Sequence, residues 1–581
     1  MELLYVWIED YNNIHHQGFN FSPKHRFEFT PTAYDENKKV TSGTLTHKPT
    51  NTNYPKNFFG EHISNITAIV GRNGSGKSSL VKALYHYTLM NKGYLFIYEK
   101  IQEEKQTEIM YCSNITVDIK FDTPTLIRDT TPALFSEKNN LFIGNVIYYS
   151  PFINSNRNKL LSSKIDNNIG NMEQMATTLF SIAHNPNSEA TAAAPKQIYH
   201  PFLSAYCAQE MTTQISFIKE ITSRKEQIIP PEIVIPKEVE LGIPFYGGNL
   251  SERMAECPNS DDFILYMIVD ALNRDMFNKG KVREEDFSYS ITEIEANEWL
   301  EDICEKRGYK KEEIESFCRL LNHEVPVLDN YGDDEGGKVV NYTIPASNLP
   351  QEVLLKRETG ARSSWVNDLA VTLTWHDLSD GEATMLSLFA RLWEKLQKTN
   401  HSCIVLLDEF ELGLHPQWQK EAIGRLVKFF EMMNKKHHII LVSHSPFLVS
   451  DLPRENIIFL DKDAEGNCVV KAPQDMERTF GANIHSLYRS SFFMDGVMGK
   501  FAEEKIDGVI KDLNGRFDAI EEERKETRKK EMEYIIGQIG EPIIRNELRK
   551  MYNEKFHLFG SLDERIAKLE GELAELKSMK G

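Results

Sequence analysis

The sequence is poor in cysteine, and the few cysteines that it has are scattered. Seven cysteines occur in 581 residues, at positions 112, 207, 257, 304, 318, 403 and 468, and no two of them are close in the chain. Disulfide frameworks and structural zinc sites need closely spaced cysteines. The spacing therefore argues against both and favours reduced thiols in a cytosol.

The chain also lacks a long apolar run and an excess of basic residues. No uninterrupted apolar stretch could span a bilayer, and Glu2, Glu9 and Asp10 stand where a secretory signal would be basic. We therefore expect a soluble, cytoplasmic protein with no membrane association. A formal net charge of −19 argues against binding nucleic acid through bulk electrostatics, but it leaves a local basic groove open.

Length and composition indicate a globular protein of several parts. With 41% hydrophobic residues a core is expected, and 581 residues are too many for a single core. Strand and helix patterns alternate near the N-terminus and again after about residue 350, with mainly helical patterns between and beyond. We predict two halves of one α/β domain at 1–150 and 351–490, a mainly helical insert at 151–350, and a helical C-terminal region at 491–581.

The strongest motif is a glycine-rich loop at residues 71–78. It fits the pattern G-x-x-x-x-G-K-[ST], with an apolar strand pattern at 66–70 before it and a helical pattern at 79–84 after it. Glycines let backbone N–H groups turn toward phosphates, and the helix N-terminus adds partial positive charge. The lysine supplies a point charge and the serine hydroxyl can ligate Mg²⁺. The predicted nucleotide-binding residues are Gly71, Arg72, Asn73, Gly74, Ser75, Gly76, Lys77, Ser78 and Ser79.

A second motif is an apolar strand pattern at 403–407 that ends in Asp408 and Glu409. Ligand sites lie at the carboxyl ends of parallel strands. Asp408 would hold Mg²⁺, and Glu409 would orient or deprotonate an attacking water. The simpler explanation is that Asp408 and Glu409 are two surface acids at the end of a strand. The phosphate loop upstream argues against that explanation.

Two weaker signals follow the same logic. Ser379 and Gly381 precede a helical pattern at 383–396 and could form an anion site, although Ser379 with Glu382 is also an ordinary capping box, which in isolation is the better reading. His444 follows a buried strand pattern at 439–442. A lone histidine there is usually structural, but 36 residues after Asp408 it becomes a candidate sensor of the γ-phosphate.

Taken in order, the phosphate loop, LSDGE, LLDEFELGLHP and VSHSP are similar to the head of ABC-type ATPases, a P-loop NTPase fold with a mixed central sheet. They most resemble the RecF/SMC-like and OLD-like ATPases. Residues 412–416 and 479–485 resemble the ATPases of Septu and retron-associated anti-phage defence systems. The motifs cover 1–150 and about 350–490, whereas the insert and tail match loosely at best.

This resemblance implies roles for the motif residues. ATP would lie between the phosphate loop of one head and Ser379, Gly381 and Glu382 of another, so that ATP holds together a head-to-head homodimer or a higher oligomer with an even number of chains. Glu409 would be the hydrolytic base, His444 the switch histidine, and Ser78 and Asp408 the Mg²⁺ ligands. Residues 413–415 would couple the two sites.

The sequence departs from the transporter pattern in two places. Asp380 and Glu382 stand where transporters usually have Gly and Gln, and residues 149–152 lack the Gln expected there. Ser379 follows Lys77 by 302 residues, far more than a transporter cassette needs, and no long heptad arms flank the head. Beyond residue 490 we expect no Toprim nuclease, since no Asp-x-Asp occurs there.

The resemblance thus implies an ATP-driven switch in a bacterial anti-phage defence complex that controls a partner nuclease. An HNH-type nuclease is the expected partner, with a retron reverse transcriptase and its RNA–DNA as a further one. The alternative is a RecF/Rad50-like DNA-repair ATPase that binds DNA itself. A transporter cassette is disfavoured by the size of the insert.

Overall fold

The computed structural model describes the two halves of the head, parts of the insert, and most of the C-terminal region. The described residues are 1–49, 54–85, 92–101, 107–129, 135–136, 139–140, 146–149, 213–221, 236–245, 264–265, 267–268, 272, 293–321, 327–329, 338–345, 348, 372–375, 378–397, 399, 401–493, 496 and 498–556. Contacts divide the chain into two units, Met1–Phe493 and Met494–Gly581.

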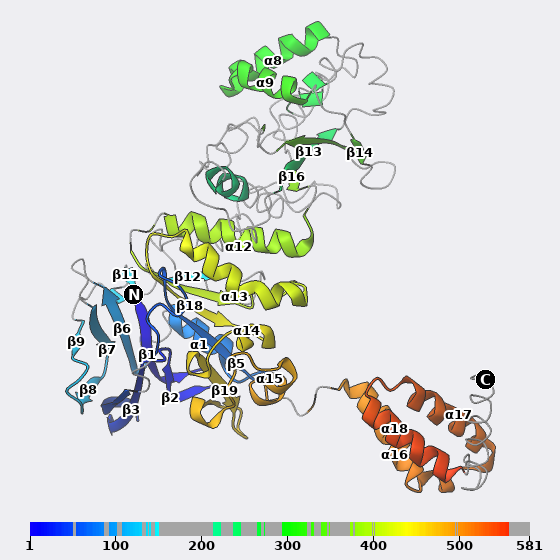
Figure 1. Cartoon of the computed structure of the whole chain (residues 1–581). Helices are drawn as coiled ribbons and strands as arrows, with labels where there is room; N and C mark the ends of the chain where they lie inside the picture. The colour runs from blue at the N-terminus through cyan, green and yellow to red at the C-terminus, as the bar shows by residue number, and fades with distance from the viewer. Residues whose placement is uncertain are drawn as a thin grey trace, which may run out of the picture. The chain divides into compact units, whose positions relative to one another are not determined.

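A six-stranded sheet organises the first unit. Its strand order is β12-β17-β18-β5-β19-β20, and all neighbours are parallel except β19 and β20. Figure 1 labels β12, β18, β5 and β19 of this sheet. The strands are β5 (Ile63–Gly71), β12 (Val146–Tyr149), β17 (Ile404–Asp408), β18 (His437–Val442), β19 (Ile457–Lys462) and β20 (Cys468–Lys471). Segments more than 300 residues apart in the chain therefore become neighbours in the sheet.

The central strands β17 and β18 are mostly apolar because both faces of the sheet are covered. All residues of β17 and β18 are buried. Leu407 and Leu441 belong to one apolar cluster, whereas their neighbours Leu406 and Ile440 belong to another on the opposite face.

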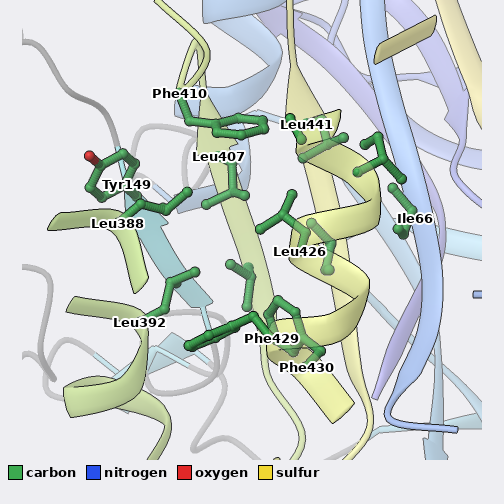
Figure 2. Close-up of a cluster of buried hydrophobic side chains, with 14 of the residues drawn as sticks. Ile66, Tyr149, Leu388, Leu392, Leu407, Phe410, Leu426, Phe429, Phe430 and Leu441 are labelled. Carbon is green, nitrogen blue, oxygen red and sulfur yellow. The ribbon is translucent and has the colours of Figure 1, made fainter. Parts of the chain in front are cut away.

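Two helices cover the first face. They are α12 (Asp380–Gln397) and α13 (Pro416–Glu431). Leu388 and Leu392 of α12 and Leu426 and Phe429 of α13 pack toward Leu407 of β17 (Figure 2). One face of α12 meets the sheet, and the apolar residues in 383–396 therefore recur at the spacing of a helix. This is the pattern from which the sequence predicts the helix.

The second face meets α1 (Lys77–Tyr85) and an N-terminal sheet. That sheet has the order β2-β1-β6-β7-β9. The same part of the chain also forms a three-stranded sheet with the order β3-β4-β8. Leu3, Val6 and Phe96 share a cluster with Leu80 and Leu406. The strands are β1 (Glu2–Tyr11), β2 (Ile14–Asn20), β3 (His25–Tyr34), β4 (Val40–Pro49), β6 (Tyr94–Ile101), β7 (Thr107–Ser113), β8 (Thr116–Ile119) and β9 (Leu126–Arg128), with a short pair β10 (Phe135–Ser136) and β11 (Asn139–Asn140).

A sheet that the sequence did not predict joins three strands of the insert to residues 372–375, which were expected to belong to the second half of the head. Four antiparallel strands have the order β14-β15-β13-β16, and they share an apolar cluster with helices α8 (Glu293–Arg307) and α9 (Lys311–Leu321). The strands are β13 (Glu238–Phe245), β14 (Val327–Asp329), β15 (Lys338–Pro345) and β16 (Thr372–Trp375). The expectation of a mainly helical lobe overlooked this sheet because its strands pair across about 130 residues of chain, a separation that local patterns do not reveal.

The remaining elements complete the two units. In the first unit they are α14 (Pro446–Ser450), α15 (Ile484–Ser490) and the 3₁₀ turns η6 (Arg454–Asn456) and η7 (Pro473–Asp475). The second unit contains α16 (Lys500–Leu513), η8 (Arg516–Ala519), α17 (Glu522–Gln538) and α18 (Pro542–Lys555), which enclose their own apolar cluster. Within the described parts of the chain, no helix is long and apolar enough to cross a bilayer.

Candidate nucleotide-binding site

The phosphate loop joins the end of β5 to the start of α1, as the sequence predicts. Gly71, Gly74 and Gly76 all have positive φ angles, of 151°, 78° and 102°. A side chain at position 71 would also collide with β19, because its Cβ would lie 1.9 Å from the carbonyl oxygen of Leu460. Glycine is therefore required here both by backbone conformation and by close packing.

Lys77 is held inside the loop. Its Nζ donates to the carbonyl oxygens of Gly71 at 2.9 Å and Arg72 at 3.0 Å, and only 6% of the residue is exposed. Burial lowers the pKa of Lys77 to about 8, although Glu409 and Asp408 pull it the other way. A phosphate anion would stabilise the ammonium group in this place, because its negative charge would replace the hydration that burial removes.

The other loop residues take different positions. Arg72, Asn73 and Gly74 are exposed at the tip, and the Nε of Arg72 lies 3.7 Å from Asp461 of β19. Ser75 is fully buried, and its hydroxyl has no hydrogen-bond partner among the described residues. A buried hydroxyl in that state suits a ligand that brings acceptor oxygens, as a polyphosphate does.

Three parallel strands bring the acidic residues and the histidine to the same edge as the loop. Asp408 is the last residue of β17, Glu409 follows it, and His444 lies two residues past β18, which pairs with both β17 and β5. The Nε2 of His444 lies 3.7 Å from Oε1 of Glu409. Burial, and then the charge of Lys77, lowers the pKa of His444, so the neutral ring is favoured.

Glu409 has a backbone conformation that is rare for a residue with a side chain. Its φ angle is 54°, in the left-handed region. The conformation is held because its N–H donates to the carbonyl oxygen of Val442 at 2.8 Å, which links the loop to the end of β18. The carboxylate of Glu409 is thereby placed beside His444.

Two residues that contact this site, Tyr148 and Asn13, were not predicted from the sequence. Tyr148 of β12 donates its hydroxyl hydrogen to Oδ2 of Asp408 at 2.8 Å, just before residues 149–152, where the expected Gln is absent. Asn13, in the turn between β1 and β2, donates from Nδ2 to the carbonyl oxygen of Gly74 at 3.2 Å and accepts from the hydroxyl of Ser79 at 3.1 Å. The dipeptide Asn12-Asn13 signals a turn, but only the tertiary structure shows what that turn contacts.

The signature residues form a capping box at the start of α12. Ser379 donates from its N–H and its hydroxyl to Oε2 of Glu382, at 2.9 and 2.7 Å, and these bonds lower the pKa of Glu382. Ser379 is exposed, and among the described residues nothing outside the adjoining part of its own helix lies within 4 Å of where a Cβ at Gly381 would be. The hydrogen bonds of a capping box are thus present in the single chain, and the described residues do not cover the tip of the helix.

The sheet of mainly parallel strands, the phosphate loop after β5 and the acids at the end of β17 are the features that the sequence predicts for the head of an ABC-type ATPase. The predicted α/β fold class is confirmed. Among the known proteins whose sequences match parts of the chain, two are named as probable retron ATPases and one as a Septu protein.

Over 122 residues the chain is 34% identical to the Retron Ec83 probable ATPase of Escherichia coli, which covers 20% of this chain and 22% of that protein. It is 22% identical over 196 residues to the Retron Vc95 probable ATPase of Vibrio cholerae, 30% of this chain and 36% of the other. It is 28% identical over 121 residues to the Septu protein PtuA of Bacillus mycoides, 20% of this chain and 16% of the other. The matches thus span about a third or less of each relative's length.

A family model described as "AAA domain, putative AbiEii toxin, Type IV TA system" matches residues 297–450, which include Ser379, Asp408, Glu409 and His444. Among solved structures, the recombination mediator RecF is 9% identical over 81% of this chain and 98% of its own, with a TM-score of 0.21. The Smc head domain of Pyrococcus furiosus is 12% identical over 82% and 97%, with a TM-score of 0.23. Scores this low carry no argument about the fold. The sequence matches and the sheet support an ABC-type ATPase of the retron and Septu group.

Proposed function

We propose that this chain is the ATP-binding and hydrolysing subunit of an anti-phage defence complex, and that two heads close on ATP to control a partner nuclease. One observation carries the proposal. Lys77, Asp408, Glu409 and His444 come from three separate segments of the chain and lie at one edge of one parallel sheet.

Each of these residues has a chemical role in the proposal. Lys77 and the loop N–H groups bind the phosphates, and Glu409 orients or deprotonates the attacking water. His444, as a neutral ring, contacts the γ-phosphate. Ser78 and Asp408 would hold Mg²⁺, which neutralises phosphate charge when it is bound.

The dimer is proposed from the exposed tip of α12. Ser379 and Gly381 lie at the N-terminus of an 18-residue helix, where the helix dipole favours an anion. The capping box leaves this tip open on one side, which a γ-phosphate held by a second head could approach. ATP then stabilises the closed dimer and hydrolysis releases it.

The defence role is proposed from the relatives, which are named as retron ATPases and a Septu protein. In such a complex the closed dimer would set the activity of another chain. We propose an HNH-type nuclease as that chain, with a reverse transcriptase and its RNA–DNA as a further component.

Hydrolysis tests the site. We expect Lys77→Ala and Glu409→Gln each to lower ATP turnover by a factor of about 100 or more, because each removes a group that acts at the phosphate. Glu431→Gln, at an exposed position at the end of α13, is the matched control and should hydrolyse ATP like the parent. Parent-like turnover in both site variants would refute the assignment.

A second variant tests the dimer separately. Gly381→Arg places a long side chain in open space at the start of α12, so the single head should still fold and bind ATP. We expect it to block closure, and hence to abolish both the ATP-dependent dimer of Glu409→Gln in size-exclusion chromatography and the turnover of the parent. A Gly381→Arg head that dimerises with ATP would contradict the proposed arrangement.

The defence role needs a cellular readout. We expect cells that carry the complete system to lose protection from phage with Lys77→Ala and to keep it with Glu431→Gln. Protection that persists without ATP turnover would show that hydrolysis does not serve defence.

A further inference from the structure

Glu411 is a buried acid that the proposed function does not use. It lies in the loop between β17 and α13, two residues after Glu409, and only 2% of it is exposed. Its Oε1 accepts from the hydroxyl of Ser443 at 2.5 Å and from the backbone N–H of His444 at 3.1 Å. The carboxylate thus contacts the peptide that carries the switch histidine.

The same segment is joined to β18 by a second link. The N–H of Glu409 donates to Val442, one residue before Ser443, at 2.8 Å. A hydrogen bond within the loop adds to these two links: the N–H of Leu412 donates to the carbonyl oxygen of Glu409 at 3.1 Å. Ser443 also accepts from the N–H of Ser445 at 2.8 Å, so the turn around His444 is held from both sides.

A carboxylate in this place is costly. Burial raises the pKa of Glu411, the bonds from Ser443 and His444 oppose the rise, and its Oε2 has no hydrogen-bond partner among the described residues. An apolar residue of similar size would avoid the cost of desolvation. The retained hydrogen bonds are therefore the feature that distinguishes Glu411 from a packing residue.

We propose that Glu411 is a positioning residue that sets the ring of His444 against Glu409. It acts through the two hydrogen bonds of its Oε1, which fix the Ser443–His444 peptide to the loop that follows Glu409. The inference rests on the proposed function, because it gives His444 and Glu409 their roles in hydrolysis.

A pair of variants separates the hydrogen bonds from packing and charge. Glu411→Gln and Glu411→Leu both remove the charge and both fill the site, but only Gln keeps an acceptor for Ser443 and His444. We expect kcat for ATP hydrolysis to fall by about tenfold or more in Glu411→Leu and by about threefold or less in Glu411→Gln, with KM little changed in either. Equal losses in the two variants, or a loss that lies in KM, would overturn the proposal.

A double variant shows whether Glu411 acts through His444. In a His444→Ala background, Glu411→Leu should cause no further loss beyond about twofold, because the ring that it positions is absent. A full additional loss would show another route and would contradict the proposal. The two proposals also fail differently: parent-like turnover in His444→Ala would refute the site, whereas additive losses would refute only the role of Glu411.

Discussion

The hydroxyl of Tyr148 donates to Oδ2 of Asp408 at 2.8 Å. The two residues belong to neighbouring parallel strands, β12 and β17, although they are 260 residues apart in the chain. Tyr148 therefore orients a carboxylate that is itself buried, with 1% exposure, at the edge where the proposed Mg²⁺ would bind. Such outer partners of a metal ligand keep its geometry and affinity.

Removing that hydroxyl should weaken metal binding. We expect Tyr148→Phe to raise the Mg²⁺ concentration needed for half-maximal turnover by about tenfold, and to weaken Mn²⁺ binding in the presence of a non-hydrolysable ATP analogue by a similar factor. The control is Tyr149→Phe, next in the chain, because its ring belongs to the apolar cluster on the other face of the sheet. An unchanged Mg²⁺ requirement in Tyr148→Phe would contradict the expectation.

The contacts of Asn13 predict an effect on nucleotide affinity. Its side chain bonds to both Gly74 and Ser79, so it braces the phosphate loop and the first turn of α1 together. We expect Asn13→Ala to weaken ATP binding by about three- to tenfold, and Asn13→Asp to weaken it more, because Asp cannot donate to Gly74 and adds a negative charge near the phosphates.

Titration calorimetry with a non-hydrolysable analogue measures this order of affinities. Asn37→Ala, in an exposed turn, is the matched control. If Asn13→Asp bound the analogue as tightly as the parent, the brace would be irrelevant to binding.

The state of Lys77 predicts a pH dependence. Burial lowers its pKa to about 8, and a bound phosphate favours the protonated form. The full electrostatic contribution of Lys77 to ATP binding is therefore present below about pH 8, and it is lost as the pH rises from there to the higher pKa that the lysine has with phosphate bound. We expect the dissociation constant for ATP to increase above pH 8, by up to about tenfold per pH unit.

The pH dependence of ATP affinity should disappear when the amine of Lys77 is removed. Lys77→Met should bind ATP weakly and with an affinity that does not change between pH 7.5 and 9 beyond the small effect of the nucleotide's own titration. A parent protein whose affinity is flat over that range would show that Lys77 stays charged.

The apolar layer between the sheet and α13 predicts a stability effect. Leu426 is fully buried and packs toward β17 (Figure 2). Leu426→Ala should lower the free energy of unfolding of the first unit by about 2–5 kcal/mol, through lost burial and a cavity. Lys420→Ala, at an exposed position of the same helix, should change it by less than about 0.5 kcal/mol.

Tryptophan fluorescence during urea denaturation can follow this unit alone. All six tryptophans lie at or before Trp418, whereas the second unit begins at residue 494. An equal effect of the two substitutions would contradict the packing seen around Leu426.

Much of the head is predictable from local signals. The continuous apolar runs at 66–70, 403–407 and 439–442 are strands buried on both faces, and the glycines at 71, 74 and 76 have the positive φ angles that their loop requires. The sheet of the insert was missed because β13 pairs with β15 and β16, which lie about 100 to 130 residues farther along the chain. Pairing over such distances depends on the packing of the whole lobe, which no short pattern encodes.

The sequence by itself determined the local features of the proposed site: a glycine-rich loop between a strand and a helix, and apolar strands that are followed by acids or by a histidine. Those features are local, because glycine torsions, strand patterns and side-chain types depend on a few consecutive residues. Only the tertiary structure decided which other residues hold the loop, the acids and the histidine in place. The contacts of Asn13, Tyr148 and Glu411 join residues that are 32 to 260 positions apart in the chain. Such contacts form only when the strands are side by side, so they depend on the sheet order rather than on any motif.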